Sequence, residues 1–251
     1  FLDNENQMIL ESCENRQVIK ISGSDKENFL NGLITNTIEN DLNYSALLTP
    51  QGKYLSDFFL IRSNDDILID IEKSLAENLL SRLLMYKLRA DVNISSTDMP
   101  VSRGQGVIPK NAFKDPRHSS LGWRLYGVKG QTPTTNWAQL YIDACIPKSG
   151  VELLPNETYI LEAGFERLSG VNFKKGCYVG QEVTARMKHK TTLKKGFSTI
   201  NILGCAPIGT AIFSNEKICG TLFSQSGGRA IAYLKYDKVS KNMKAGEAIL
   251  N

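Results

Sequence analysis

The order of short apolar strands and amphipathic helices in the first part of the chain constrains its fold more than any other feature. Residues 44–48 and 54–61 are two predicted strands, and the turn Thr49-Pro50-Gln51-Gly52 between them has its proline early and its glycine late. Further strands are predicted at 18–21 and 67–71. Strands and helices mixed in this order, with tight hairpins, indicate an α+β fold rather than a doubly wound sheet.

Two helices are predicted among these strands, each beginning at a capping box in which a Ser and a following Glu satisfy free backbone N–H groups. The boxes are Ser24 with Glu27 and Ser74 with Glu77. The apolar residues after each box have helical spacing. They are Phe29, Leu30, Leu33 and Ile34 in the first helix and Leu75, Leu79, Leu83 and Leu84 in the second.

After Gly196 the sequence changes to short strand-like segments separated by turns, a pattern that indicates a small barrel or sandwich. We therefore predict an α+β core over residues 1–190, built from two interleaved subdomains, and a C-terminal β-barrel domain over residues 191–251. The predicted strands of the barrel are 197–203, 210–214, 218–224 and 229–236. Residues 131–136 are the expected mobile loop.

Composition excludes several classes of protein. Hydrophobic residues make up 41% and charged residues 22% of the chain, as in soluble globular proteins, and no apolar run approaches the ~20 residues of a membrane helix. The first residues have no features of a secretory leader. The five cysteines are scattered without a Cys-x-x-Cys pair, which indicates reduced thiols and a cytoplasmic location. With only two histidines as well, no tightly bound metal is expected.

The segment 174–182, Lys-Lys-Gly-Cys-Tyr-Val-Gly-Gln-Glu, places the thiol of Cys177 among basic residues. Nearby positive charge favours the thiolate, the form that attacks electrophiles and binds soft metals. Gly176 and Gly180 bracket the cysteine, so the backbone can bend sharply there or let a ligand approach closely. The alternative is a half-buried structural cysteine beside a solvated basic strand, because such charges also occur in structural settings.

Residues 175–182 resemble the signature of the YgfZ-type folate-binding proteins. These are relatives of the aminomethyltransferase (T-protein) of the glycine cleavage system, and they act in iron–sulfur cluster assembly or repair. Further segments similar to that family follow in the family's order; they are 32–36, 48–53, 115–117, 121–122, 146–147, 161–164 and 180–186. The chain departs from the family at Cys145, where glycine is more usual, and at 141–143, where an expected Arg is absent.

The resemblance implies an aminomethyltransferase-like folate-binding fold, α+β in class, with a small C-terminal β-barrel. It implies tetrahydrofolate, including its polyglutamylated form, as the cofactor. It also implies iron–sulfur assembly or client proteins as partners. Cys177 would be the functional thiol, a transient cluster or sulfur ligand shared with a partner, because one cysteine cannot complete a cluster site alone.

Asp57 is a candidate catalytic and folate-binding residue. By period-2 alternation it shares a strand face with Leu55, Phe59 and Ile61, where a carboxylate is costly unless it is hydrogen-bonded. The alternative is a strand-end aspartate that faces water. The spacing Gly52-x-x-x-x-Asp57 is similar to the position of the essential aspartate of the T-protein, so the resemblance places Asp57 close to the folate.

Glu162 is the candidate for the pteridine ring, whose amino group and ring N–H form a donor pair for a carboxylate. The string Leu161-Glu162-Ala163-Gly164 is similar to the T-protein segment with that role, and the alternative is an exposed helix acid. Tyr178 could stack on a bound ring or belong to the core. Arg117, two residues after Asp115, is interpreted as a structural ion-pair partner.

Positive charge is concentrated between residues 174 and 195, which carry seven Lys or Arg side chains against the single acid Glu182. The glutamate tail of a folate explains this strip, with Lys188 and Lys190 as tail-binding candidates. An RNA-associated module is a weaker interpretation, because the strip lacks interleaved aromatic residues. The main alternative function is a true aminomethyltransferase that transfers a one-carbon unit to tetrahydrofolate.

Overall fold

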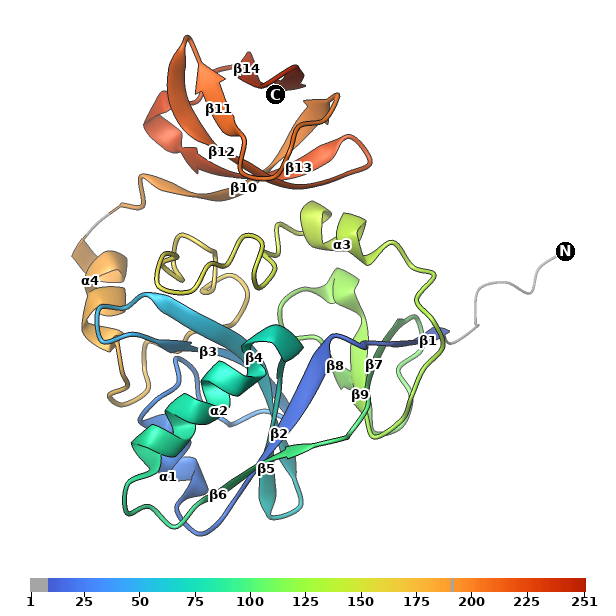
Figure 1. The fold of residues 1–251 in the computed structure, drawn as a ribbon, viewed down its shortest axis with the longest axis vertical. Helices are drawn as coiled ribbons and strands as arrows, with labels where there is room; N and C mark the ends of the chain where they lie inside the picture. The colour runs from blue at the N-terminus through green and yellow to red at the C-terminus, as the bar shows by residue number, and fades with distance from the viewer. Residues whose placement is uncertain (1–8, 191) are drawn as a thin grey trace, which may run out of the picture. The chain divides into compact units, whose positions relative to one another are not determined.

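The structure, a computed structural model, describes residues 9–190 and 192–251, apart from the side chain of Lys190. A five-stranded sheet with the strand order β3-β4-β5-β2-β6 forms its first layer (Figure 1). Strand β2 pairs antiparallel with both β5 and β6. The strands are β2 (Arg16–Ser22), β3 (Leu42–Leu48), β4 (Tyr54–Ser63), β5 (Asp66–Glu72) and β6 (Asn93–Thr97). The four strands predicted in this region are confirmed.

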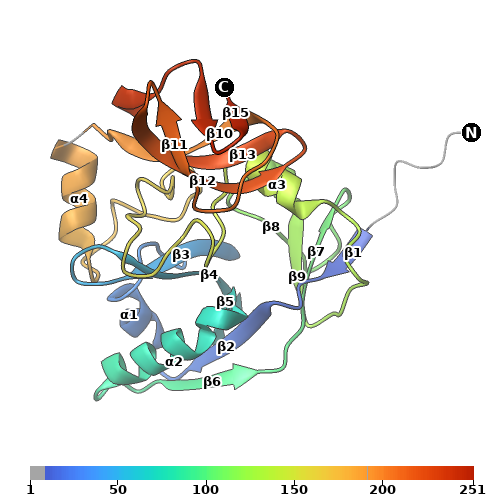
Figure 2. The same cartoon turned by 45° about the horizontal axis from the view of Figure 1, so that its top comes forward.

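Helices α1 (Lys26–Asn31) and α2 (Lys73–Lys87) pack against this sheet (Figures 1 and 2). Their buried residues Leu30, Leu79 and Leu83 join the sheet's isoleucines in one hydrophobic core. Burial of such side chains contributes about 1.5–3 kcal/mol each. Leu84 was predicted on the buried face of α2 but is 51% exposed.

The predicted capping boxes are wrong, and in the first of them long-range partners bind the side chains. Ser24 donates its backbone N–H and its hydroxyl to Asp91 instead of capping a helix. Glu27 pairs with Arg62 of β4. Helix α1 begins at Lys26 and α2 at Lys73, one residue before Ser74, and neither helix has a side-chain cap.

A second, smaller sheet has the order β1-β7-β9-β8. Its strands are β1 (Ile9–Ser12), β7 (Val101–Gln105), β8 (Phe113–Lys114) and β9 (Trp123–Tyr126). The buried Glu11 of β1 accepts hydrogen bonds from the backbone N–H groups of Thr134 and Thr135, at 2.7 and 2.8 Å, and from both hydroxyls, each at 3.0 Å. The segment predicted as a mobile loop is therefore tied to β1.

The chain divides into two compact units that each combine distant segments. The first unit contains Phe1–Gln51, Leu55–Thr135 and Glu166–Gln181, and the second contains Gly52–Tyr54, Asn136–Phe165 and Glu182–Asn251. Among the described residues, no helix is both long and apolar enough to cross a membrane.

The second unit contains a closed barrel with the strand order β10-β13-β12-β11-β14-β15, drawn orange to red in Figure 1. Its strands are β10 (Lys195–Leu203), β11 (Ala211–Ser214), β12 (Lys217–Ser226), β13 (Arg229–Lys235), β14 (Met243–Ala245) and β15 (Ala248–Leu250). The barrel has its own core, which includes Ile212, Leu222 and Leu250. The barrel alternative is therefore confirmed over the sandwich. The closing strands β14 and β15 were not predicted, because three residues show no clear alternation.

Helices α3 (Trp137–Asp143) and α4 (Gln181–Lys190) precede the barrel. Cys145 follows the end of α3 with a φ of 49°, in the left-handed region where glycine is favoured after a helix. This backbone explains why glycine suits the position at which the chain departs from the family it resembles. Nearby, the buried Glu152 accepts hydrogen bonds from the backbone N–H groups of Lys148, at 2.9 Å, and Ser224, at 3.0 Å.

Candidate functional site

The loop that carries Cys177 is anchored to the chain that follows α1. Thr35 donates its hydroxyl to the carbonyl of Gly170 at 2.7 Å, and its own carbonyl accepts the backbone N–H of Asn172 at 2.9 Å. The amide of Asn36 donates to the carbonyl of Ser169 at 2.8 Å. The motif 32–36 therefore holds the segment 169–172, which leads into the cysteine loop within the first unit.

Lys175 completes this anchor. Its Nζ donates to the carbonyls of Asn31, Ile34 and Asn36, at 2.9, 2.5 and 3.1 Å. Burial lowers the pKa of Lys175 to about 8, while the three carbonyl oxygens favour the protonated form and oppose this shift. Predicted as part of a basic strip, Lys175 instead fixes the position of the cysteine loop.

Cys177 itself is exposed, two residues from this anchor. The half-buried structural alternative is therefore wrong. Tyr178, next to it, is 7% exposed and lies 5.1 Å from the ammonium of Lys175, so the structure favours the core interpretation of this tyrosine. The loop thus presents the thiol to solvent while its neighbours are held inside.

The four other cysteines are also free thiols. Cys205 is exposed, Cys145 is partly exposed, and Cys13 and Cys219 are buried. Burial raises the pKa of Cys219. Within residues 9–190 and 192–251, no group of three or more His, Cys, Asp or Glu residues is placed to hold a metal ion.

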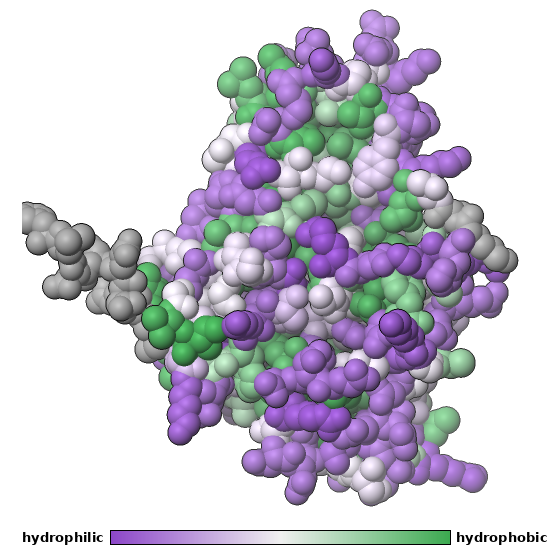
Figure 3. Space-filling view, turned by 180° about the vertical axis from the view of Figure 1, so that it is seen from behind, coloured by the Kyte–Doolittle hydropathy of each residue, from purple (hydrophilic) through white to green (hydrophobic). Residues whose placement is uncertain are grey.

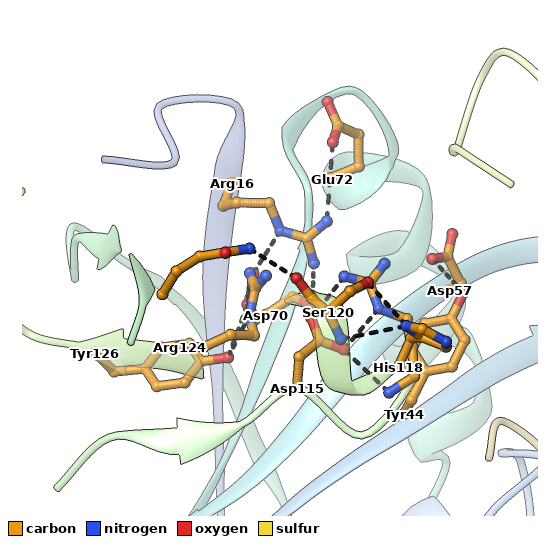
Figure 4. Close-up of polar contacts among 12 residues, drawn as sticks. Arg16, Tyr44, Asp57, Asp70, Glu72, Asp115, His118, Ser120, Arg124 and Tyr126 are labelled. Atoms are coloured by element: carbon orange, nitrogen blue, oxygen red, sulfur yellow. Dashed lines mark hydrogen bonds and ion pairs between the residues drawn. The ribbon is translucent and has the colours of Figure 1, made fainter. Parts of the chain in front are cut away.

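Asp57 lies in β4 and is 5% exposed, so it is not the water-facing aspartate of the alternative interpretation. Its Oδ2 accepts the hydroxyl of the fully buried Tyr44 at 2.8 Å (Figure 4). A hydrogen bond of this kind reduces the cost of burying the carboxylate. Both faces of β4 are buried around it, which alternation alone did not predict.

Sequence reasoning missed a buried ion cluster around Asp70 of β5 (Figure 4). Arg16 donates to Asp70 Oδ1 at 2.6 Å, and Arg124 and Tyr126 donate to Oδ2 at 2.6 and 2.8 Å. Burial raises the pKa of Asp70, but Arg124 and Arg16 outweigh it and hold that pKa below its usual value. The only signal in the sequence was an acid in the middle of an isoleucine-rich strand.

Arg117 is a structural ion-pair partner, as predicted. Its Nε and terminal nitrogen donate to the two carboxylate oxygens of Asp115, at 3.0 and 2.7 Å. Burial raises the pKa of Asp115, and Arg117 brings it below its usual value. The guanidinium also lies 4.7 Å from the ring of Phe59 and 5.4 Å from that of Tyr44, the partner of Asp57. The arginine thereby packs on the two aromatic rings next to the candidate aspartate.

Glu162 belongs to the second unit and lies in a series of turns, with a side chain 9% exposed. It is therefore not an exposed helix acid. Its Oε2 accepts the hydroxyl of Tyr233 at 2.6 Å, and Oε1 lies 3.8 Å from the ammonium of Lys195. Burial and the hydrogen bond to Glu162 raise the pKa of Tyr233, which keeps its hydroxyl a donor.

A cavity of about 440 Å³ in the second unit has Glu162 in its wall. Lysines dominate the rest of the lining, with two apolar side chains between them. The lining consists of Glu162, Met187, Thr192, Leu193, Lys194, Lys195, Lys235, Asp237 and Lys238. The carboxylates Glu162 and Asp237 together with the lysines fit a ligand that has both N–H donors and carboxylates, as a folate does.

The two lysines predicted for a folate tail are placed differently. Lys188 is exposed in α4 and is not one of the described residues that line the cavity. The side chain of Lys190 lies outside the described part of the structure. Lys235 and Lys238 line the cavity but were not predicted, because they follow the basic strip by some 40 residues in sequence.

The chain is similar to curated proteins named for iron–sulfur cluster assembly. It is 28% identical over 214 residues to the mitochondrial iron–sulfur cluster assembly factor IBA57 homolog of Pyricularia oryzae, across 73% of this chain and 55% of that protein. It is 24% identical over 275 residues to the human mitochondrial factor IBA57, across 90% of this chain and 77% of that protein. The chain spans about half the length of the fungal relatives.

The expected cytoplasmic location is wrong by this comparison, because the curated relatives are named as mitochondrial proteins. Free cysteines indicate a reducing compartment. Free cysteines do not distinguish the cytosol from another reducing compartment, so they gave no physical basis for choosing the cytosol.

The remaining comparisons concern the fold. Residues 194–251 match the family described as the CAF17 C-terminal beta-barrel domain. Glycine cleavage system aminomethyltransferase T from Bartonella henselae superposes with a TM-score of 0.79 over 98% of this chain and 84% of that chain, at 13% sequence identity. The chain therefore has the aminomethyltransferase fold with a C-terminal barrel of the CAF17 type, and its curated relatives are iron–sulfur cluster assembly factors.

Proposed function

We propose that this protein is a mitochondrial iron–sulfur cluster assembly factor of the YgfZ type, with Cys177 as its functional thiol. The observation that carries the proposal is the exposed thiol on a loop fixed by Lys175, Thr35 and Asn36. The names of the curated relatives support a role in iron–sulfur cluster assembly. An exposed thiol on an anchored loop can meet a partner protein without rearrangement, which suits transfer of a cluster.

Cluster binding through Cys177 requires ligands from elsewhere. Iron–sulfur clusters are held by several thiolates, and one cysteine supplies a single ligand. The described residues offer no grouped His, Cys, Asp or Glu ligands of their own. We therefore assign the cluster to a complex in which a partner protein provides the remaining ligands, with the cluster as cargo rather than as a resident cofactor.

We further propose that a reduced folate binds the cavity beside Glu162. Glu162 would hold the pteridine donors, because Tyr233 fixes its Oε2 and the carboxylate lies in the wall of the cavity. The lysines of the lining would hold the carboxylates of the tail. A bound reduced folate supplies one-carbon chemistry. Asp57, in the first unit, is the catalytic residue of this proposal.

The thiol is tested by Cys177→Ser, a nearly isosteric change at an exposed site. We expect the melting temperature to stay unchanged and iron–sulfur enzyme activity to remain unrestored when the variant is expressed in cells that lack the protein. Cys205→Ser, at the other exposed cysteine, is the matched control and should complement fully. Full complementation by Cys177→Ser would remove the thiol mechanism and favour the aminomethyltransferase alternative, in which no protein thiol is required.

The folate proposal is tested by calorimetry with tetrahydrofolate. Glu162→Gln should weaken binding roughly ten- to a hundred-fold, because a charge-assisted hydrogen bond contributes about 1.5–3 kcal/mol. Glu166→Gln, at an exposed acid nearby, should leave the dissociation constant unchanged.

A second comparison tests which lysines bind the glutamate tail of the folate. Lys235→Gln should weaken polyglutamylated folate more than the monoglutamate, whereas Lys188→Gln should affect neither if the cavity lysines hold the tail. A loss in Lys188→Gln without a loss in Lys235→Gln would instead assign the tail to the basic strip. An unchanged dissociation constant in Glu162→Gln would remove Glu162 from the folate site altogether.

A further inference from the structure

Among the described residues, the strands of the barrel carry four exposed large apolar side chains. Leu203 is 72% exposed, Ile218 51%, Phe213 42% and Ile249 41%. Their neighbours along the strands, such as Ile202 and Ile212, are buried, so the alternation of each strand turns these four outward. Figure 3 shows exposed hydrophobic side chains, in green, on the barrel at the top of that view.

The strand register places these four side chains in one line with a lysine at its centre. Leu203 of β10 lies opposite Ile249 of β15, and Ile249 lies opposite Lys244 of β14. Lys244 lies opposite Phe213 of β11, which lies opposite Ile218 of β12. Residues directly opposite each other project from the same face of a sheet. These five residues form what we call the barrel row.

The barrel row is suited to side-chain docking. Among its described strands the barrel is closed, so it offers no free edge to which another strand could be added. Neighbouring strands lie about 4.8 Å apart, so five positions span roughly 19 Å. This length equals about three and a half turns of an α-helix, whose apolar residues recur at every turn along one side.

The charge of Lys244, at the centre of the row, distinguishes between two possible occupants, a second copy of this chain and a different protein. In a symmetric dimer formed through the centre of the row, the two-fold axis would bring Lys244 against the Lys244 of the second copy. Like charges opposed at an interface are strongly unfavourable. A carboxylate flanked by apolar side chains complements the row instead, because it pairs with Lys244 while its neighbours cover the four apolar residues.

We propose that the barrel row docks an amphipathic helix of a partner protein, with an acidic residue of that helix on Lys244. Specific interfaces bury about 800 Å² on each partner, and a few central apolar residues carry most of the binding energy. The row supplies such a centre. The inference does not depend on folate or on the thiol, since none of its residues lines the folate cavity.

The test uses two designed helical peptides with the same leucine stripe, one with glutamate and one with lysine at its centre. The full chain should bind the glutamate peptide at least roughly ten-fold more tightly than the lysine peptide. Lys244→Glu should reverse this preference. In NMR spectra of the full chain, the amide signals of the barrel row should shift on addition of the glutamate peptide.

A matched pair of variants completes the test. Phe213→Ser should weaken the glutamate peptide roughly ten-fold or more, whereas Val239→Ser, at a 41% exposed valine outside the row, should leave it unchanged. Thermal melts confirm that both variants fold. Equal affinity for the two peptides, or no binding of either, overturns the proposal. So does a dimer of the protein alone that Phe213→Ser dissociates, because a second copy would then be the occupant.

Discussion

Asp70 shows how one buried carboxylate can hold two arginines inside a sheet. Its side chain is fully buried, and Arg16 and Arg124 approach different oxygens of the same carboxylate. The Arg124 guanidinium also lies 4.3 Å from the ring of Phe59. Buried ion pairs contribute little net stability, but removing one partner leaves an uncompensated charge inside the protein. The cluster is therefore sensitive to changes at its centre.

Asp70→Asn should lower the free energy of unfolding by about 3–5 kcal/mol, because the two arginines lose their counter-charge. Urea denaturation at neutral pH measures this loss. The control is Asp66→Asn on the same strand, which removes an ion pair with Lys20 whose side chains are 26% and 44% exposed. That change should cost less than about 1 kcal/mol. Equal effects of the two variants would contradict the role given to the cluster.

The Asp70 cluster also sets an acid dependence. The arginines lower the pKa of Asp70 in the folded state, so its contribution to stability is fully present above its unfolded pKa of about 3.9. That contribution is lost as pH falls through the lower folded pKa. Asp70→Asn should therefore flatten this part of the acid unfolding profile.

For single residues, the sequence predicted which side chains are candidates for the site better than it predicted the partners of those side chains. The polar environment of Asp57 and the structural pairing of Arg117 followed from local pattern and were found. The cluster around Asp70 did not follow from it, because Arg16 and Arg124 are each 54 residues away along the chain. Pairing of β2 with β5 brings Arg16 close to Asp70, and the smaller sheet supplies Arg124 to the same carboxylate.

Among the elements, the cysteine loop has Lys175 as the anchor nearest to its thiol. Lys175→Met keeps the aliphatic part of the side chain but removes its hydrogen bonds to the carbonyls of Asn31, Ile34 and Asn36. Amide hydrogens of residues 172–180 should then exchange roughly ten-fold faster or more, since each lost bond contributes about 1 kcal/mol. Hydrogen exchange detected by mass spectrometry measures this change directly.

Lys174→Met is the matched control for the cysteine loop, because the neighbouring Lys174 side chain is exposed. Exchange in this variant should remain at the wild-type rate. Comparable acceleration in both variants would mean that charge around the loop, rather than the anchor of Lys175, holds it in place.

Elements were predictable where the pattern was local. The apolar strand 67–71 and the short strands after Gly196 were found where expected. Helix starts were not, because Ser24 and Glu27 form bonds to Asp91 and Arg62, far along the chain. The three-residue strands β14 and β15 become strands only through their partners in the closed barrel.

In the whole molecule, each unit contains, among its described residues, a hydrophobic core of its own. One joins α1 and α2 to the five-stranded sheet, and the other fills the barrel. The α+β class and the barrel were predictable from the residues, and the superposition on aminomethyltransferase T confirms both. The interleaving of segments was harder to predict in detail, because short stretches such as Gly52–Tyr54 change unit within a continuous strand pattern.

The cysteine loop separates the chemistry of its thiol from the stability of the protein. Every contact that fixes the loop is made by residues other than Cys177, whose side chain is exposed. Under the proposed function, oxidation of this thiol to a sulfenic acid or a mixed disulfide would therefore block the role we propose for it without unfolding the chain. Proteases that remove unfolded proteins would not recognise such a molecule. Oxidative stress would accumulate an intact, inactive pool that reduction alone could restore.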